Sequence, residues 1–252
     1  MCQAINWQLT SLFLGFIVTF LCTGKNLMAL EVIYKDALML AINKPAGLPV
    51  HKGAGQKMTT LEDYLDDLRF GLPKRPELAH RLDKDTTGCL ILGRNKVALK
   101  RLSELFQERK IGKTYLAVVH GVIEAQSGEI KLPIAKKSGD KRSWWGKVGE
   151  KGQPALTRYE VMQQSDLATL VKLTPITGRT HQLRIHLQAI GHAIVGDQIY
   201  GKRDKSYSLC LHCFEMTVPL YAKKEKITLN APLPQAFEQA MAALKLTNPN
   251  TN

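Results

Sequence analysis

The chain has 252 residues, with 35 Lys and Arg against 22 Asp and Glu, so its formal net charge is +13. Hydrophobic residues make up 44% and charged residues 23% of the chain. These ordinary globular values exclude a disordered chain, a collagen-like fibre and a polytopic membrane protein. At roughly 150 residues per domain, the length fits one large domain or two small ones. The excess of positive charge favours an acidic partner, with nucleic acid ahead of an anionic membrane surface.

The first 27 residues differ from the rest of the chain. Residues 12–22 form an uninterrupted apolar run, which is shorter than the ~20 residues that a membrane-spanning helix needs. No Lys or Arg precedes this run, unlike the start of a signal peptide. We therefore expect that translation starts at Met28, or that residues 1–27 form an apolar extension outside the working protein. The same interpretation predicts one folded domain over 28–246 and a frayed tail over 247–252.

Hydrophobic periodicity predicts short strands and a few helices in the rest of the chain. In chain order, the predicted elements are a strand-like region over 31–43, a helix over 60–68, a strand over 90–92, a helix over 96–110, strands over 114–119, 156–161 and 168–173, a helix over 181–190, a strand-like region over 214–229 and a helix over 237–244. Thr60 and Asp63 resemble a capping box, and Ala98 and Leu102 share the apolar face of the clearest helix. Strands interrupted by a few helices, without regular βαβ alternation, indicate an α+β fold with a mixed sheet.

Several common catalytic and binding signatures are absent. The glycines at 53–55 lack the third glycine of a dinucleotide-binding fingerprint, and Gln107 stands where a phosphate-binding loop ending at 112–114 needs its first glycine. The sequence contains no GxSxG and no HExxH motif. His181 and His186 are five residues apart rather than four, so they do not share a helical face as zinc ligands do. These absences argue against a dehydrogenase, an NTPase, a serine hydrolase and a zinc protease.

Two clusters are more polar than their apolar surroundings. HRLDKDTTG at 80–88 leads directly into an apolar strand, and TGRTHQLRIH occupies 177–186. A carboxylate flanked by Arg and Lys stays ionised at neutral pH, so Asp83 could serve as a nucleophile, as a base or as a plain ion-pair partner. A solvated loop and an exposed helix face would give the same pattern, because surface ion pairs are common.

The first cluster closely resembles the HRLD-x-x-T-[ST]-G motif of the RluA-type pseudouridine synthases. Three further segments match that family in the same order: NKPAG at 43–47, KTYLAVVHG at 113–121, and the conserved Gly, Arg, His and Asp positions of 178–201. The resemblance therefore covers most of the chain. Some members also carry a small N-terminal RNA-binding domain, for which we expect no counterpart in residues 1–27.

The resemblance implies a fold and an activity. The fold is an α+β catalytic domain with a mixed, largely antiparallel central sheet, flanking helices and an active-site cleft between two halves. The activity is isomerisation of specific uridines in ribosomal or transfer RNA to pseudouridine, by an aspartate-dependent mechanism with base flipping and without a cofactor or a metal. We expect a monomer that does not bind membranes and that works in the cytoplasm. The odd count of five cysteines also favours a reducing compartment.

The resemblance also assigns roles to five residues. Asp83 matches the catalytic aspartate, and Arg184 matches the arginine that pairs with it. Arg81 matches the arginine that fills the space left by the flipped base. Tyr115 matches the tyrosine that packs on the target base, and Leu183 matches an apolar wall of the pocket. These roles fit the chemistry, because cleaving a glycosidic bond needs an ionised carboxylate and aromatic stacking offsets part of the flipping cost.

The most basic stretch, 136–151, contains six Lys or Arg against two acidic residues. Trp144 and Trp145 lie in its middle. One interpretation is that this stretch grips the RNA backbone while a tryptophan stacks on a base. The other is a solvated loop whose tryptophans cover the edge of the core.

Two other functions are compatible with parts of the sequence. A carboxylate-based glycosidase or nucleosidase is disfavoured, because Asp85 is the only neighbour that could complete the usual carboxylate pair with Asp83. A non-catalytic RNA-binding or ribosome-assembly module is the second alternative. It is disfavoured because Asp83, Tyr115 and Arg184 are all intact.

Overall fold

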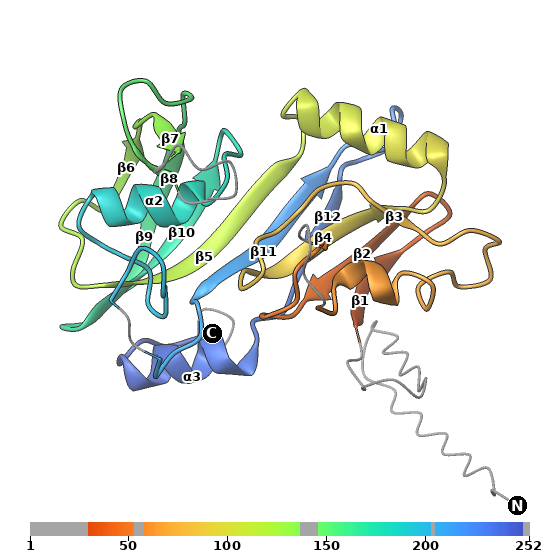
Figure 1. The fold of residues 1–252 in the computed structure, drawn as a ribbon. Helices are drawn as coiled ribbons and strands as arrows, with labels where there is room; N and C mark the ends of the chain where they lie inside the picture. The colour runs from red at the N-terminus through yellow and green to blue at the C-terminus, as the bar shows by residue number, and fades with distance from the viewer. Residues whose placement is uncertain (1–29, 53–57, 137–145, 203–204, 249–252) are drawn as a thin grey trace, which may run out of the picture.

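The structure is a computed structural model that describes residues 30–52, 58–136, 146–202 and 205–248 (Figure 1). The expected extension at 1–27, together with Trp144 and Trp145, lies outside these residues. Within the described part of the chain, no helix is long and apolar enough to cross a membrane.

Short strands dominate the fold. The elements are β1 (Glu31–Lys35), β2 (Met39–Lys44), the 3₁₀ helix η1 (Leu61–Tyr64), β3 (Glu77–Leu78), β4 (Thr87–Gly93), α1 (Lys96–Gln107), β5 (Gly112–His120), β6 (Ser127–Ile130), β7 (Ile134–Lys136), β8 (Gly146–Val148), β9 (Thr157–Gln164), β10 (Ala168–Pro175), α2 (Gln182–Ala189), β11 (Leu211–Val218), β12 (Ile227–Asn230) and α3 (Gln235–Ala243). Except for the predicted helix over 60–68, each predicted element has a counterpart of the same kind.

Most of these strands belong to one large sheet. Its order is β1-β2-β4-β11-β5-β10-β9-β6, and in addition β3 pairs with β4 and β12 pairs with β11. The pair formed by β4 and β11 is parallel, whereas the other pairs described in the sheet are antiparallel. Strands β7 and β8 form a separate antiparallel hairpin. This topology confirms the expected α+β fold with a mixed, largely antiparallel sheet.

Two hydrophobic cores divide the molecule into halves. The first core collects side chains from β2, β4, α1 and β12, and the second collects side chains from β5, β10, α2 and α3. Figure 1 shows α1 over one half and α2 over the other, with β5 and β11 running between them. Tyr115 on β5 packs against both cores, so the boundary between the halves passes beside it.

Helix α1 has the N-terminal cap and the buried apolar face that its sequence predicts. Asn95 caps its N-terminus, because the Asn95 Oδ1 atom accepts a hydrogen bond from the Ala98 amide at 2.8 Å. Ala98 and Leu102 are buried, as their spacing predicts. The helix ends at Gln107, three residues before the predicted end, because the chain turns at Arg109, where φ is 56°.

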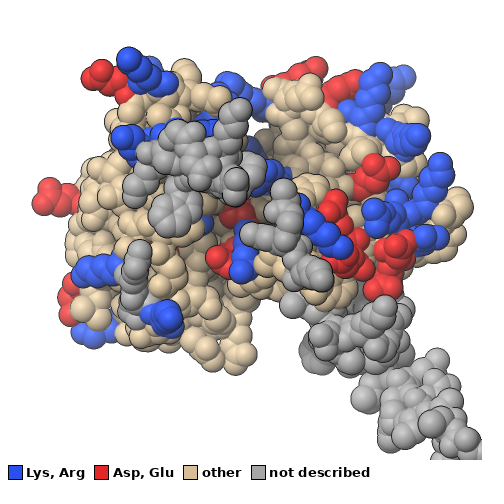
Figure 2. All heavy atoms as spheres, viewed as in Figure 1, with Lys and Arg blue, Asp and Glu red and all other residues tan. Residues whose placement is uncertain are grey.

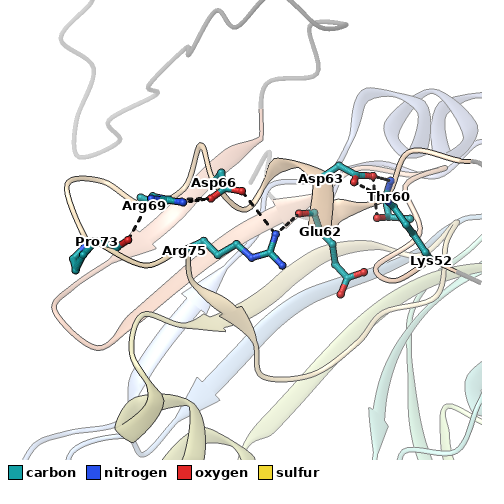
Figure 3. Close-up of polar contacts among 8 residues, drawn as sticks. All are labelled: Lys52, Thr60, Glu62, Asp63, Asp66, Arg69, Pro73 and Arg75. Carbon is teal, nitrogen blue, oxygen red and sulfur yellow. Dashed lines mark hydrogen bonds and ion pairs between the residues drawn. The ribbon is translucent and has the colours of Figure 1, made fainter.

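The predicted helix over 60–68 is wrong in type and length. Only one 3₁₀ turn, η1, forms there, because the hydrogen bonds join residues three apart, such as the Asp67 amide to the Tyr64 carbonyl. The predicted capping box is present between Thr60 and Asp63. Figure 3 shows this capping box and the nearby ion pairs of the same segment, including the pair between Asp66 and Arg69.

Candidate active site

A pocket of about 480 Å³ opens between the two halves (Figure 2). Three segments supply most of its lining: 80–86 before β4, 106–115 at the end of α1 and the start of β5, and 175–184 at the start of α2. All five residues singled out by the sequence line this pocket: Arg81, Asp83, Tyr115, Leu183 and Arg184. The structure thus brings together residues that lie up to about a hundred positions apart in the chain, and it confirms the expected cleft between two halves.

The loop that carries Asp83 is fixed at its start by His80. The Nε2 atom of His80 accepts a hydrogen bond from the Ile91 amide on β4 at 3.0 Å. The His80 ring also stacks against Phe106 on α1, with ring centroids 4.6 Å apart. Leu82 is buried in the first core. The loop is therefore attached to both β4 and α1 immediately before Asp83.

Lys44, at the end of β2, fixes the same loop immediately after Asp83. Its side chain is fully buried, and its Nζ atom donates hydrogen bonds to the carbonyls of Lys84 at 2.9 Å, Pro45 at 2.7 Å and Leu48 at 3.0 Å. Burial lowers the pKa of Lys44 to about 8, against the opposing effect of the Asp85 and Asp83 charges. The structure thus gives the lysine of the NKPAG segment a positioning role that sequence reasoning missed.

Asp83 faces a histidine across the pocket. The Oδ2 atom of Asp83 lies 3.8 Å from the Nε2 atom of His181, and both side chains are mostly buried. The other ring nitrogen of His181, Nδ1, lies 2.9 Å from the hydroxyl of Tyr200. That hydroxyl accepts a hydrogen bond from the Gly146 amide at 3.0 Å. Sequence reasoning considered His181 only as a zinc ligand and as part of a polar helix face.

Arg184 does not pair with Asp83, and that expectation was wrong. Its Nε and Nη2 atoms instead donate to the two carboxylate oxygens of Asp197, each at 2.7 Å. Both residues are buried, and Asp197 also accepts the amides of Ile199 and Tyr200. These backbone amides hold the Asp197 carboxylate in place as the acceptor for Arg184, on the same side of the cleft. Burial opposes the charge of Arg184, but the Asp197 hydrogen bonds and charge, with a contribution from Asp83, raise its pKa overall.

Tyr115 and Leu183 form the less polar part of the pocket. Tyr115 lies on β5 opposite Cys213 of β11, and Leu183 lies on α2 with only 7% of its surface exposed. Burial raises the pKa of the Tyr115 hydroxyl, and the nearby Cys213 and Asp83 act in the same direction. The Tyr115 side chain is therefore a neutral phenol at physiological pH.

The charges that line the pocket are strongly unequal. Asp83 is the one acidic side chain among the described lining residues. The basic lining residues are Arg81, Arg109, Lys113, Arg179 and Arg184. Figure 2 shows Lys and Arg side chains, together with some Asp and Glu side chains, on both sides of the hollow. This arrangement suits a polyanion whose reacting group meets a single carboxylate.

The described residues contain no cluster of three or more His, Cys, Asp or Glu side chains placed to hold a metal ion. The chemistry available in the pocket is that of one carboxylate, two imidazoles, one phenol and several fixed cations. Such a set can cleave and remake a glycosidic bond next to a stacked base.

Comparisons with known proteins agree with this chemistry. The sequence model of the RNA pseudouridylate synthase family matches residues 38–189. The chain is 42% identical over 214 residues to an uncharacterized RNA pseudouridine synthase of Zymomonas mobilis, covering 84% of this chain and 97% of that protein. It is 34% identical over 228 residues to ribosomal large subunit pseudouridine synthase C of Pasteurella multocida, covering 85% of this chain and 68% of that protein.

A solved structure shows the same fold. Human RNA pseudouridylate synthase domain containing 4 is 28% identical, with a TM-score of 0.73, and the match covers 87% of this chain and 94% of that one. The match to the family model includes Asp83 and Tyr115 in the pocket and Lys44 beneath it. This chain therefore belongs to the family of RNA pseudouridylate synthases, isomerases that convert uridine in RNA to pseudouridine.

Proposed function

We propose that this protein isomerises a uridine of large-subunit ribosomal RNA, with Asp83 as the catalytic residue. The observation that carries the proposal is that Asp83 is the one acidic side chain among the described residues that line a basic pocket. Relatives that are at least 34% identical are named as ribosomal large subunit pseudouridine synthases, which favours this RNA over transfer RNA.

The reaction places a defined demand on Asp83. The bond between the ribose C1′ and the uracil N1 breaks, the base turns, and a new bond joins C1′ to C5. The proton on C5 then leaves and N1 gains one, so the reaction is an isomerisation without any other reactant. An ionised carboxylate beside the sugar stabilises the positive charge that develops there. A covalent sugar adduct and a glycal route both need a carboxylate in this place.

The remaining pocket residues bind the flipped nucleotide in this proposal. Tyr115 stacks on the uracil, which offsets part of the few kcal/mol that flipping costs. Leu183 closes the apolar side of the pocket. Arg81 is exposed and can enter the helix from which the base has left. Arg184 is held by Asp197 and acts on the substrate as a fixed positive charge.

The proposal extends to the domain and its location. All strands from β1 to β12 except β7 and β8 share one sheet, and α3 follows β12 directly, which supports a single catalytic domain over 28–246. We also propose that this domain acts as a monomer. We place it in the cytoplasm, because the named relatives modify a ribosomal subunit.

Mapping of pseudouridine in cells with and without the gene tests the proposed substrate. We expect one or more pseudouridines of large-subunit ribosomal RNA to disappear without the gene. They should return when wild-type protein is expressed. Unchanged ribosomal RNA together with a lost position in transfer RNA would contradict the ribosomal assignment.

A further inference from the structure

A hydrogen bond joins Tyr200 to His181, and the far ring nitrogen of His181 faces the carboxylate of Asp83. Three contacts define this arrangement: the Gly146 amide to the Tyr200 hydroxyl at 3.0 Å, that hydroxyl to Nδ1 of His181 at 2.9 Å, and Nε2 of His181 to Oδ2 of Asp83 at 3.8 Å. The two rings meet edge to face, with centroids 5.6 Å apart. These contacts therefore connect the loop after α2 to the loop that contains Asp83 in the other half.

The hydrogen bonds around Tyr200 favour one of the two neutral tautomers of His181. The Tyr200 oxygen already accepts the Gly146 amide, so its own proton is available for Nδ1 of His181. A neutral imidazole that accepts at Nδ1 carries its proton on Nε2. That proton then points toward the Asp83 carboxylate.

The backbone of His181 has an uncommon left-handed conformation, as residues at functional sites often do. His181 is the N-cap residue of α2, with φ 54° and ψ 20° in the left-handed region, and its side chain makes no capping hydrogen bond. A non-glycine residue in this region is uncommon, and such residues cluster at functional sites. The His181 side chain lines the pocket and does not cap the helix.

We propose that His181 is a positioning residue for Asp83, and that Tyr200 holds it with the Nε2 proton facing the carboxylate. The inference rests on the proposed function. In the free enzyme the Nε2 to Oδ2 distance is 3.8 Å, and such contacts commonly shorten when substrate binds. The hydrogen bond then fixes the rotamer of Asp83 against the ribose.

Burial keeps the ring of His181 neutral, and the charged groups around the ring act in both directions. Burial lowers the pKa of His181, and the positive charges of Arg184 and Arg81 act in the same direction, whereas the carboxylates of Asp83 and Asp197 oppose them. The guanidinium of Arg184 also lies over the Tyr200 ring, 5.3 Å from its centroid. Once the contact shortens, the neutral ring can therefore donate a hydrogen bond to Asp83 without forming a full ion pair.

Two substitutions at one position separate positioning from mere structural support. In His181→Gln, the amide nitrogen occupies about the place of Nε2 and can still donate to Asp83. In His181→Asn, the amide reaches only the place of Nδ1, so the contact with Tyr200 is kept and the donor to Asp83 is lost. Asn also tolerates the left-handed backbone better than Gln, so a purely structural role would favour the Asn variant.

The experiment measures kcat and KM on large-subunit ribosomal RNA from cells that lack the gene. We expect kcat of His181→Asn to fall about 10- to 100-fold with little change in KM, because a misplaced reacting group affects the chemical step. His181→Gln should recover most of the activity, because its amide can still donate to Asp83.

Tyr200→Phe is a second variant that keeps the ring and removes only the hydroxyl. We expect its kcat to fall about 10-fold, with only a small fall in the thermal unfolding midpoint, because the Gly146 amide loses its acceptor. His192→Asn is the matched control. Like Tyr200, His192 follows α2 and makes a hydrogen bond, in this case to the His120 carbonyl, but it does not line the pocket. Its kcat should match the wild type.

Two results would overturn the inference in different ways. Wild-type protein that forms no pseudouridine in any RNA would refute the proposed function and the inference with it. An active wild type, with His181→Asn or Tyr200→Phe as fast as the wild type, would refute the inference alone. If kcat falls only in proportion to the unfolding midpoint, and His181→Asn is more active than His181→Gln, His181 has a structural role and the inference is likewise refuted.

Discussion

Lys44 and Arg184 are two buried cations that stabilise the site in different ways. Lys44 has no acidic partner within ion-pair distance among the described residues and instead donates to three backbone carbonyls. Arg184 makes a two-pronged ion pair with Asp197. An ammonium has three donors around one atom and suits converging carbonyls, whereas a guanidinium is a planar fork that suits a carboxylate.

Replacing Lys44 by Met tests the role of this cation in stability. Three carbonyls would lose their donor in a buried place, so we expect the free energy of unfolding to fall by about 2 kcal/mol or more. Urea unfolding at pH 7 measures this loss. Lys84→Met is the control, because its side chain is exposed and only its carbonyl is used; we expect a change within about 0.5 kcal/mol. Equal midpoints for Lys44→Met and wild type would contradict the account.

The buried His212 makes the stability depend on pH. Its Nε2 atom donates to the Ala231 carbonyl at 3.1 Å, and its Nδ1 atom lies 2.7 Å from the Thr87 hydroxyl. Burial lowers its pKa to about 4 from 6.5. Between these values the unfolded chain binds more protons, so this contribution to stability is complete above pH 6.5 and is lost as the pH falls toward 4.

Urea unfolding of wild type and His212→Asn between pH 7 and pH 4 checks this prediction. We expect the wild type to lose about 3 kcal/mol more than the variant over this range, which corresponds to the 2.5-unit difference in pKa. Parallel losses in the two proteins would show that His212 is not the source.

At the scale of residues, sequence motifs identified which side chains meet but not how they pair. Asp83, Tyr115 and Arg184 were predicted to share a site, and all three line the pocket. The partner of Arg184 could not be predicted, because Asp83 and Asp197 are both available to it in the sequence. The backbone amides that converge on Asp197 decide between them, and such convergence exists only in the folded chain.

At the scale of elements, helix α1 is the one whose stability depends most visibly on a single cap. We expect Asn95→Ala to lower the free energy of unfolding by about 1 kcal/mol, because the Ala98 amide loses its acceptor. Asn95→Asp keeps an acceptor oxygen and should restore most of the loss. Thermal or urea unfolding of the three proteins measures this; an equal loss in both variants would show that the cap is not the cause.

The parallel contact between β4 and β11 depends on Gly88. A Cβ atom at this position would lie 2.3 Å from the Cys213 carbonyl oxygen, and φ is +107°. We expect Gly88→Ala to cost at least about 3 kcal/mol, because backbone rather than a flexible side chain must move. Gly191→Ala is the control, since φ is +88° but nothing lies within 4 Å; its cost should be about 1 kcal/mol. Equal unfolding midpoints for the two variants would contradict the steric argument.

Local patterns predicted most elements but not their arrangement in space. The pairing of β9 with β10 could be predicted, because the two strands follow each other with a short connection. The contact of β4 with β11 could not, because Gly88 and Cys213 are 125 positions apart and alternation does not encode a partner. The helix predicted over 60–68 failed because its apolar spacing equally fits a 3₁₀ turn followed by further turns.

At the scale of the whole molecule, one large sheet runs through both halves, whereas each half has its own hydrophobic core. The pocket lies between the halves. The loop with Asp83 packs on the first core through Leu82, and α2, which begins after His181, packs on the second core through Leu183. The net charge of +13 indicated an acidic partner, and the pocket concentrates five cations around one carboxylate. In the proposed function, the positive charge supports the binding of RNA, and Asp83 supplies the carboxylate that the reaction needs.

The most direct test of the central claim is the rate of pseudouridine formation by Asp83→Asn. The substrate is large-subunit ribosomal RNA from cells that lack the gene, and wild-type protein is measured in parallel. The substitution keeps the size of the side chain and removes its charge, so the variant should unfold at the wild-type midpoint, bind the RNA and form no pseudouridine. Pseudouridine formation by Asp83→Asn at the wild-type rate would contradict the assignment of Asp83 as the catalytic residue.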